Sequence, residues 1–458
     1  EQTADQQEAE EAAVVTVPEH QRKARRTHEE LVKGIPSRDE ILELPEAEQL
    51  CPVCGTRLEA IGKEFVRHEF RFTPAKGEVV NIYRTTYKCP ECTEKDELAD
   101  SPAFVKTEVP EALIPNSYAS PSAAAWVMYQ KFANAIPLYR QEQDWKQLGV
   151  CLKRATLANW IIYCAQNYFR PMYDYFHRTL LTRKYLMADE TRIQVLKEPG
   201  RNPETDSFMW LFRSGEDGLA PIILFHYTET RAKYNAAAFL EGFQDGYLET
   251  DGYQGYNNLP GVKRCSCWAH IRRYFVDAIP KGKQLDYNQP AVQGVHYCDR
   301  LARLESTITS KYGADHEKRK QMRLEKEKPV LEAFWAWVDS QHPTRNTRLD
   351  KALTYVKNRR ETSMTYLEDG RCSFTNNLSE NAIRPFTLGR KNWLFSDSVE
   401  GAQASAITYT MVEMAKAHNL NIYGYLSYIL EQRPDESWND EQLAELAPWS
   451  EKLQTLKI

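Results

Sequence analysis

The sequence has no apolar run approaching the roughly eighteen residues needed to cross a bilayer, and no internal repeat is apparent. It also lacks a strong charge of either sign, because 59 lysines and arginines stand against 64 aspartates and glutamates, for a net charge of −5. A membrane partner is therefore not expected, and the usual global sign of nucleic-acid binding is missing. Local clusters of charge are therefore more informative than the net charge. The 458 residues leave room for about three domains.

The N-terminal residues differ in charge from the rest of the chain. Residues 1–12 contain five acids and no base, a composition typical of disorder. The basic cluster Arg22–Arg26 follows, and it can either track DNA phosphates or remain a solvated arm. We therefore expect residues 1–45 to form a disordered, partly basic arm.

Four of the ten cysteines form two pairs with the spacing of metal-binding knuckles. These are Cys51 and Cys54, followed by Cys89 and Cys92. Four thiolates in this arrangement can hold a tetrahedral Zn²⁺, and we expect a structural zinc ribbon over residues 46–100. Disulfides or a redox pair are the alternatives. Neither fits well, because no secretory signal is present and the other six cysteines are scattered as in a reduced cytosolic chain.

Residues 101–182 have the pattern of a helical domain. A helix is predicted over 121–135 after the capping candidate Ser120, and two more over 138–148 and 154–168. The last two are joined by a glycine turn, so they can form a helix-turn-helix that reads a major groove. A packing or dimerisation role for the same helices is the alternative.

Two aspartates follow predicted strands. Asp189 ends the apolar run 185–188, and Asp251 ends the segment 246–250. Strands are also predicted over 208–213 and 221–228, and a helix over 235–243. A meander of three strands, a helix and a fourth strand beside the first would bring Asp189 and Asp251 together on one sheet. Taken singly, each aspartate is equally consistent with a turn or a helix cap.

A third carboxylate, Glu380, lies on a predicted helix that starts at residues 375–377. Asn377, Glu380 and Arg384 fall at spacings of three and four, so they share one polar face. Arg384 can neutralise DNA phosphate or simply pair with Glu380. Pro385 is expected to shorten or kink the helix.

Three converging carboxylates point to divalent-metal chemistry on nucleic acid. Mg²⁺ prefers oxygen ligands and keeps several waters, so two or three carboxylates suffice. Two such ions, Mg²⁺ or Mn²⁺, roughly 3.5–4 Å apart can activate a water or sugar hydroxyl and stabilise the leaving oxygen of a phosphodiester.

The segment between Asp251 and Glu380 predicts an all-α insertion over residues 281–368. Its residues 331, 334, 335 and 338 are apolar at helical spacing. Residues 301–360 carry fourteen lysines and arginines against eight acids, which favours either DNA contact or plain solubility.

Residues 388–393 are expected to follow the helix of Glu380. There Arg390 and Lys391 can clamp DNA phosphates, and Trp393 can stack on a base or pack in the core. An amphipathic helix is predicted from 402 to 417, another from 422 to 430, and a tail of residues 431–458 that packs on the core or on a partner.

Four separated motifs carry a resemblance to a known family. They are residues 188–191, 244–258, 267–273 and 376–396. In this order they resemble the transposases of bacterial insertion sequences, specifically the insertion sequence 66 family, and the resemblance covers nearly the whole chain from about residue 45.

The resemblance implies an α/β fold: an RNase H-like core over 183–280 and 369–430, interrupted by the helical insertion and preceded by the zinc ribbon and the helical domain. It implies a catalytic DDE triad of Asp189, Asp251 and Glu380. Cys267 and His270 match a Cys-x-x-His signature, and with Asn377 we interpret them as support for the site. A packed thiol and a hydrogen-bonded core histidine are the alternatives for that pair.

The function expected from the resemblance is DNA transposition. The enzyme would bind the terminal inverted repeats of its element, cleave DNA with metal-activated water and join 3′-hydroxyl ends to target DNA. A homodimer or higher multimer, accessory proteins from the same element, an upstream coiled-coil-like segment before Glu1 and a cytoplasmic, nucleoid-associated location are also implied. An RNase H-like nuclease without strand transfer and a catalytically inactive DNA-binding relative are the alternatives.

Overall fold

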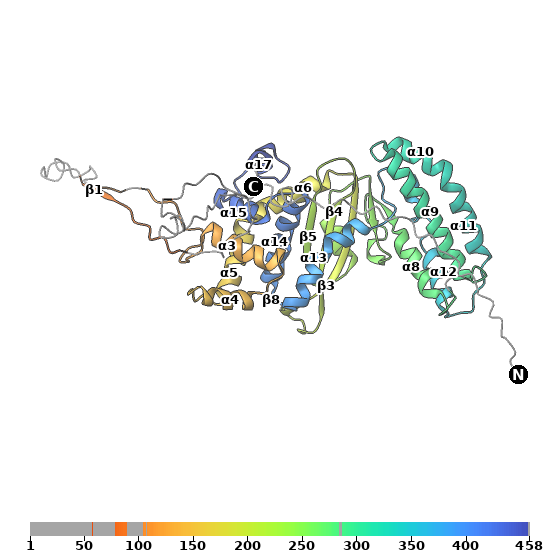
Figure 1. Cartoon of the computed structure of the whole chain (residues 1–458), viewed down its shortest axis with the longest axis horizontal. Coiled ribbons are helices and arrows are strands. Elements are labelled where there is room, and N and C mark those ends of the chain that lie inside the picture. The colour runs from red at the N-terminus through yellow and green to blue at the C-terminus, as the bar shows by residue number, and fades with distance from the viewer. Residues whose placement is uncertain (1–56, 58–77, 89–103, 107, 284–285, 457–458) are drawn as a thin grey trace. The chain divides into compact units, whose positions relative to one another are not determined.

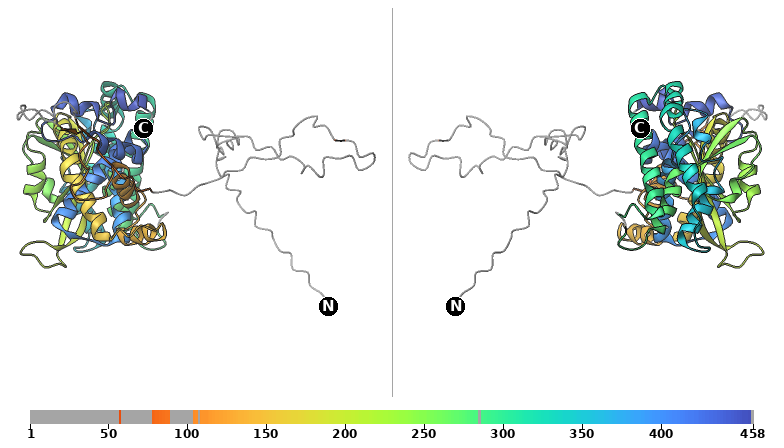
Figure 2. Two further views of the ribbon diagram at one scale, coloured as in Figure 1. Left: turned by 90° about the vertical axis from the view of Figure 1, so that its left-hand side faces the viewer. Right: turned by 90° about the vertical axis from the view of Figure 1, so that its right-hand side faces the viewer.

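The computed structural model describes residues 57, 78–88, 104–106, 108–283 and 286–456 (Figures 1 and 2). The predicted arm and the four cysteines of the predicted zinc ribbon lie outside the described residues. Apart from Arg57, the described residues belong to one compact unit, residues 76–458. Among the described helices, none is both long and apolar enough to pass through a bilayer.

A short antiparallel strand pair, β1 (Thr86–Lys88) and β2 (Phe104–Lys106), precedes a group of helices. The first helix begins after Ser120, whose hydroxyl accepts the Ala123 N–H at 3.1 Å, so the predicted cap is confirmed. The group consists of α3 (Pro121–Met128) with the π-helical turn η2 (Tyr129–Ala133), α4 (Leu138–Gln147), α5 (Arg154–Cys164) with the π-helical turn η3 (Ala165–Phe169), and α6 (Arg170–Leu181).

The pair α4 and α5 forms at the positions predicted for a helix-turn-helix. Lys153 and Arg154, at the start of α5, are exposed, whereas Leu157 and Trp160 are buried in the main core. Helix α5 packs against α3 and α14. One side of α5 therefore serves packing, and reading of a DNA groove by its exposed start stays a prediction.

The central sheet has the order β5-β4-β3-β6-β7, with β8 paired to the far end of β3. The strands β3, β4 and β5 form an antiparallel meander, and β6 returns parallel to β3 after α7 (Lys233–Phe239). The predicted return of the fourth strand beside the first is thus confirmed. The strands are β3 (Tyr185–Lys197), β4 (Asp206–Ser214), β5 (Ile223–Thr228), β6 (Gly246–Thr250), β7 (Val262–Ser266) and β8 (Phe395–Ser398).

The first strand is longer than predicted. Asp189 was expected at its end, but β3 continues to Lys197 because buried Ile193 and Val195 alternate with polar residues. Beyond Asp189 the neighbour of β3 changes from β6 to β8. Strand β6 ends at Thr250, one residue before Asp251, as predicted.

Helix α13 (Asn377–Trp393) carries Glu380 in its first turn. Pro385 does not shorten this helix, which runs on to Trp393, so that part of the expectation is wrong, while a kink at Pro385 stays a prediction. A proline removes the bond to the carbonyl four residues earlier, here that of Asn381, which is an exposed residue that water can reach. Arg390, Lys391 and Trp393 therefore belong to the last turn of the Glu380 helix and do not follow it.

Helix α14 (Val399–Ala417) is buried on nearly all sides, with thirteen buried residues, so the prediction of an amphipathic helix is wrong. It covers the outer edge of β5, whose Phe225 N–H donates to Thr410 Oγ1 at 2.9 Å. It packs against α15 (Ile422–Gln432), which is followed along the chain by α16 (Asp440–Glu445) and α17 (Glu451–Leu456). Leu443 and Leu453 of the predicted tail pack in the main core.

Five helices and a separate core lie at the β7 end of the sheet, while α3, α5, α14 and α15 lie at the β5 end (Figure 1). Residues 331, 334, 335 and 338 are buried in this second core, as predicted. Helices α9 to α12 face the viewer in the right-hand view of Figure 2. The five are α8 (Trp268–Ala278), α9 (Pro290–Tyr312), α10 (His316–Lys326), α11 (Lys328–Ser340) and α12 (Arg348–Lys357), followed by the 3₁₀ turn η5 (Thr365–Leu367).

Candidate functional site

Asp189 and Asp251 come from neighbouring parallel strands. Met187 of β3 stands opposite Glu249 of β6, and each aspartate lies two residues further along its own chain. Side chains two residues apart point to the same face of a sheet, and adjacent strands are about 4.8 Å apart. The strand register therefore brings the two carboxylates together on one face.

Asn376 links α13 to this edge of the sheet. Its Nδ2 donates to the Ala188 carbonyl at 3.1 Å, and its backbone N–H donates to Cys267 Sγ at 3.2 Å. On the same edge of β3, the Lys184 carbonyl accepts the Tyr247 N–H of β6. At Ala188, the Asn376 side-chain amide occupies the hydrogen-bonding position that a further residue of β6 would otherwise fill. Asn376 thus anchors the start of the Glu380 helix, whereas the predicted support residue, Asn377, is exposed.

The three predicted acids lie within electrostatic reach of one another. Burial, together with the negative charges of Glu190, Asp251 and Glu380, raises the pKa of Asp189 to about 8. One of the few opposing effects is the backbone N–H of Glu190, which donates to Asp189 Oδ1 at 2.9 Å. A cation placed among these carboxylates would relieve their repulsion.

Glu190 is a fourth acid beside the site, and it was not among the predicted site residues. Its side chain is almost fully buried and pairs with Arg231, whose Nε donates to Oε1 at 2.8 Å. The Tyr256 hydroxyl donates to the other oxygen. The Arg231 guanidinium in turn lies 3.6 Å from the centre of the Tyr253 ring. Glu190 is therefore held by its own cation, unlike Asp189.

Two arginines hold the loop of Asp251. Arg264 of β7 donates from Nη2 to the Asp251 carbonyl at 2.5 Å, and Arg359, just after α12, donates to the Gly252 carbonyl. A side chain at Gly252 would collide with Tyr355 and Arg359. The Asp251 side chain accepts the Tyr253 N–H at 2.8 Å. The helical region of α8 to α12 thus reaches the backbone of the candidate site through Arg359.

Cys267 and His270 lie beside Glu380. Cys267 precedes α8, and His270 is one turn into that helix. His270 Nδ1 is 3.8 Å from Glu380 Oε1, and both atoms are buried without a hydrogen-bond partner. Burial lowers the pKa of His270 and raises that of Cys267 to about 12. The ligand atoms of the three residues lie within 4.8 Å of one another.

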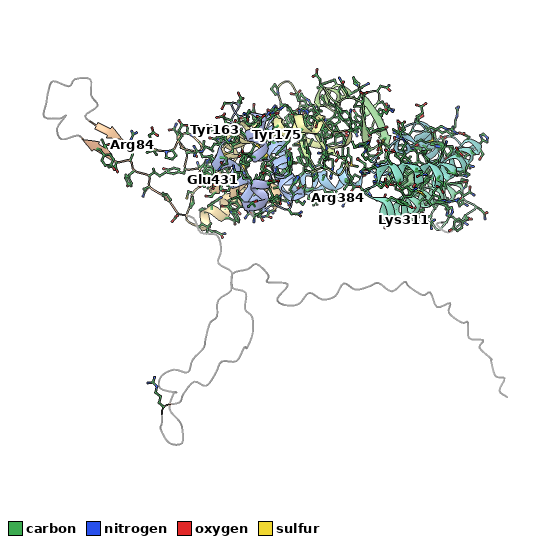
Figure 3. The ribbon with its side chains drawn as sticks, turned by 90° about the horizontal axis from the view of Figure 1, so that it is seen from above. Arg84, Tyr163, Tyr175, Lys311, Arg384 and Glu431 are labelled. Atoms are coloured by element: carbon green, nitrogen blue, oxygen red, sulfur yellow. The ribbon has the colours of Figure 1, made fainter. Side chains whose placement is uncertain are left out.

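A groove opens over Asp189 and Glu380, whereas Asp251 is not among its lining residues. Its lining residues are Asp189, Glu190, Thr191, His270, Glu380, Ile383, Arg384 and Thr387. Arg384 is exposed on α13 (Figure 3), and no ion pair between Arg384 and Glu380 occurs among the described residues. The groove therefore presents acids at its floor and a guanidinium at its rim.

The three other predicted DNA-binding residues lie at the end of α13. Arg390 is partly buried and donates to Thr191 Oγ1 at 3.1 Å, while Lys391 is exposed. Trp393 is partly buried, and its ring meets Phe386 edge-on at 5.4 Å between centroids. Its Nε1 is buried without a partner. These contacts favour the packing interpretation of Trp393 over base stacking.

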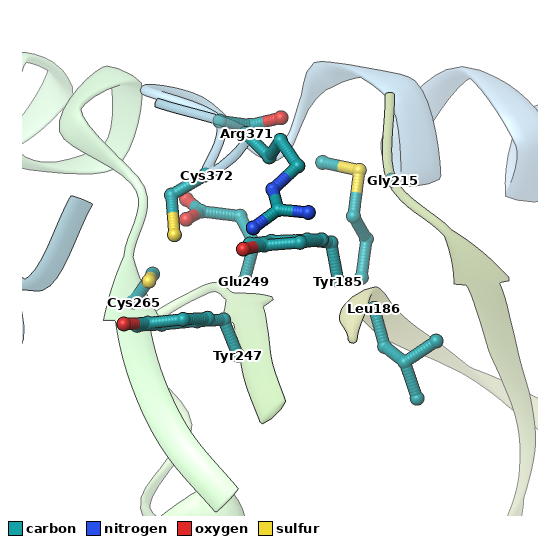
Figure 4. Close-up of a pocket in the computed structure, with 10 residues that line it drawn as sticks. Tyr185, Leu186, Gly215, Tyr247, Glu249, Cys265, Arg371 and Cys372 are labelled. Carbon is teal, nitrogen blue, oxygen red and sulfur yellow. The ribbon is translucent and has the colours of Figure 1, made fainter. Parts of the chain in front are cut away.

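A second, small cavity lies near the start of β3 and β6 (Figure 4). Arg371 covers the Tyr185 ring at 4.6 Å, and Cys265 and Cys372 lie close by. Glu249 lines the cavity with both carboxylate oxygens buried and unpartnered, and burial raises its pKa well above the usual range. None of the three predicted catalytic acids lines this cavity, so the groove is the better candidate site.

The residues at the groove fit a divalent cation. Asp189 and Glu380 line the groove, and Asp251 lies close enough for its charge to raise the pKa of Asp189. Among the described residues, Glu380 Oε1 is buried without a partner. Glu190, by contrast, already has a cation and a hydroxyl. Asp189, Asp251 and Glu380 offer the oxygen ligands that Mg²⁺ prefers.

Comparison with known proteins identifies the family. The family model described as "Transposase IS66 family" matches residues 116–404, which is more than half of the chain. A second model, "zinc-finger binding domain of transposase IS66", matches residues 48–93, the segment that contains Cys51, Cys54, Cys89 and Cys92. This match supports a structural zinc in the N-terminal region.

Three curated relatives come from Sinorhizobium fredii. Uncharacterized protein y4qI is 27% identical over 76% of this chain and 66% of its own length. Uncharacterized protein y4jD is 27% identical over 92% of this chain and 81% of its own, and uncharacterized protein y4hP is 26% identical over 88% and 73%. The predicted resemblance is thus confirmed, and the chain belongs to the IS66 family of transposases.

Proposed function

We propose that this protein is a metal-dependent DNA transposase with Asp189, Asp251 and Glu380 as its catalytic carboxylates. The observation that carries the proposal is the convergence of these acids from β3, the end of β6 and the first turn of α13. The raised pKa of Asp189 supports it, because burial and the neighbouring acids leave that carboxylate in need of a cation. Membership of the family supports the reaction class.

The proposal extends to the fold and to the N-terminal zinc. A meander followed by two parallel strands, β6 and β7, is consistent with an RNase H-like core, and α9 to α12 with an all-α insertion into it. We assign the zinc ligands to Cys51, Cys54, Cys89 and Cys92. The proposal also includes the arm over residues 1–45, the zinc ribbon over 46–100, the helical domain over 101–182 and the C-terminal tail over 431–458.

Each part of the groove has a role in this proposal. Two divalent ions held by the three acids would supply activation of the attacking water or 3′-hydroxyl and stabilisation of the leaving oxygen. Asn376 and the two arginines at the Asp251 loop position the acids. Arg384, exposed at the groove rim, binds phosphate, with Lys391 further along the same helix. Double-stranded DNA ends and target DNA are the substrates, bound by a multimer that holds two ends.

Strand transfer is the measurement that tests the reaction. A duplex carrying the element's terminal repeat, nicked beforehand to expose a 3′-hydroxyl, is incubated with the full chain, Mg²⁺ and a target plasmid. The expected product is the labelled end joined to the plasmid. Hydrolysis of DNA without a joined product would assign the site to a nuclease. If neither product forms, DNA binding is the function that remains for the chain.

Arg359→Ala is expected to lower DNA cleavage roughly tenfold and to raise the Mg²⁺ concentration needed for half-maximal rate. The reason is that Arg359 holds the Gly252 carbonyl, next to Asp251, and a small displacement of a catalytic group costs one to two orders of magnitude. Arg360→Ala is the matched control, because Arg360 pairs with exposed Asp339 at 3.0 Å. If the two variants depend on Mg²⁺ equally, Arg359 of the helical insertion does not position Asp251.

A further inference from the structure

We infer that Cys267, His270 and Glu380 form a binding site for one transition-metal ion of the Zn²⁺ or Co²⁺ type. This site goes beyond the proposed function, which needs only hard ions on carboxylates. It rests on that function solely through Glu380, which the two sites share.

The three side chains converge from two helices. Cys267 caps the start of α8, His270 is three residues further on, and Glu380 comes from the first turn of α13. The sulfur, the imidazole nitrogen and a carboxylate oxygen lie within 4.8 Å of one another. Ligands bonded to one ion at about 2.1–2.3 Å stand roughly 3–4 Å apart, so only small side-chain shifts are needed.

Two of the three ligand atoms have nothing else to bind. Among the described residues, His270 Nδ1 and Glu380 Oε1 are buried without hydrogen-bond partners, and a buried polar atom left unsatisfied destabilises the folded state. Their separation of 3.8 Å is too long for a hydrogen bond. A metal ion between them satisfies both atoms at once, which a simple packing role for His270 does not.

The ligand types select the metal. Thiol sulfur and imidazole nitrogen are ligands of Zn²⁺ and similar ions, whereas Mg²⁺ takes oxygen. The Asn376 N–H that donates to Cys267 Sγ at 3.2 Å stabilises negative charge on that sulfur. Three protein ligands leave a fourth position open, as in exchangeable rather than structural sites, and His270 and Glu380 both line the groove.

Cobalt titration tests this site by its colour. The full chain, with its N-terminal cysteines first loaded with Zn²⁺, is titrated with Co²⁺ alone and followed by absorption. Wild type is expected to bind one Co²⁺ with a cobalt–thiolate charge-transfer band. Cys267→Ser should lose that band, and His270→Ala should weaken binding at least about tenfold. A cobalt–thiolate band that remains in Cys267→Ser belongs to the N-terminal cysteines, whereas Co²⁺ bound to carboxylates alone gives no such band.

The matched control is Cys298→Ser, which removes a buried thiol of the second core and should leave the band unchanged. Circular dichroism establishes that each variant is folded, and His270→Gln replaces His270→Ala if the alanine variant is not. Spectra and affinities of Cys267→Ser and the folded His270 variant that match those of wild type would overturn the inference.

Asp189→Asn separates this inference from the proposed function. It should retain the cobalt–thiolate band while losing DNA cleavage. If Asp189→Asn loses cleavage while Cys267→Ser binds cobalt like wild type, the cysteine-containing metal site is rejected and the proposed function stands. If the cobalt–thiolate band depends on Cys267 but Asp189→Asn cleaves DNA like wild type, the proposed function is rejected and the metal site stands.

Discussion

Asp189→Asn is expected to lower Mg²⁺-dependent DNA cleavage on the order of 10³-fold or more while leaving the protein folded. The amide keeps the size of the carboxyl group, and its oxygen can still accept the Glu190 N–H that Asp189 accepts at 2.9 Å. What it loses is the negative charge among the acids that would hold the metal. Single-turnover cleavage of an end-labelled repeat duplex measures the effect.

The control for this prediction is Asp206→Asn on β4, where the acid is part of an exposed pair with Arg192. This variant should cleave like wild type. Asp251→Asn and Glu380→Gln should resemble Asp189→Asn, and all variants should bind the duplex in a gel-shift assay. Normal cleavage by any one of the three would remove that acid from the catalytic set.

Arg323→Ala is expected to destabilise the protein by about 3–5 kcal/mol, because it removes a buried ionic partner of Glu305 and the donor to three carbonyls, leaving Arg319 as the other cation beside Glu305. Arg323 is fully buried, and its guanidinium bonds Glu305 at 2.5 and 2.8 Å. It also donates to the carbonyls of Tyr366, Asp369 and Cys372, at 3.0, 3.1 and 2.9 Å. All five N–H groups of the side chain are therefore used. Urea unfolding, followed by tryptophan fluorescence, measures the loss.

Arg272→Ala provides the comparison, because Arg272 and Asp299 form an exposed pair that contributes at most about 1 kcal/mol. Burial alone would raise the pKa of Glu305, but hydrogen bonds and charge from Arg323 and Arg319 outweigh it and lower the pKa. The stability from this pair is present above the unfolded pKa and is lost as pH falls through the lowered folded value. If Arg323→Ala and Arg272→Ala lose similar free energies of unfolding at neutral pH, the buried pair contributes no more to stability than the exposed pair.

The sequence was sufficient to place Asp189 and Asp251, because each follows a segment predicted as a strand, and the two strands become parallel neighbours. The return of β6 to β3 was the simplest path for a meander followed by a helix. Glu380 could not be placed in this way, since no strand carries it. Its position depends on the contact of Asn376 with Ala188, which spans 188 residues and leaves no local pattern.

Other errors share a physical cause, which is that tertiary packing overrides local preference. Helix α13 continues through Pro385 although proline disfavours it, and Trp393 packs on Phe386 at the end of that helix. Helix α14 is enclosed on nearly all sides, so it has no single apolar stripe. The pairing of Glu190 with Arg231 and the reach of Arg359 to Gly252 are likewise set by the fold and not by spacing.

The contact of α14 with β5 has a consequence for how copies of this chain can associate. An uncovered outer strand offers N–H and C=O groups to any other extended chain, which is a common route to fibres. Here the Phe225 and Ile223 N–H groups donate to Thr410 Oγ1 and Met414 Sδ, at 2.9 and 3.1 Å. A continuous sheet across two copies of this chain therefore cannot start at β5.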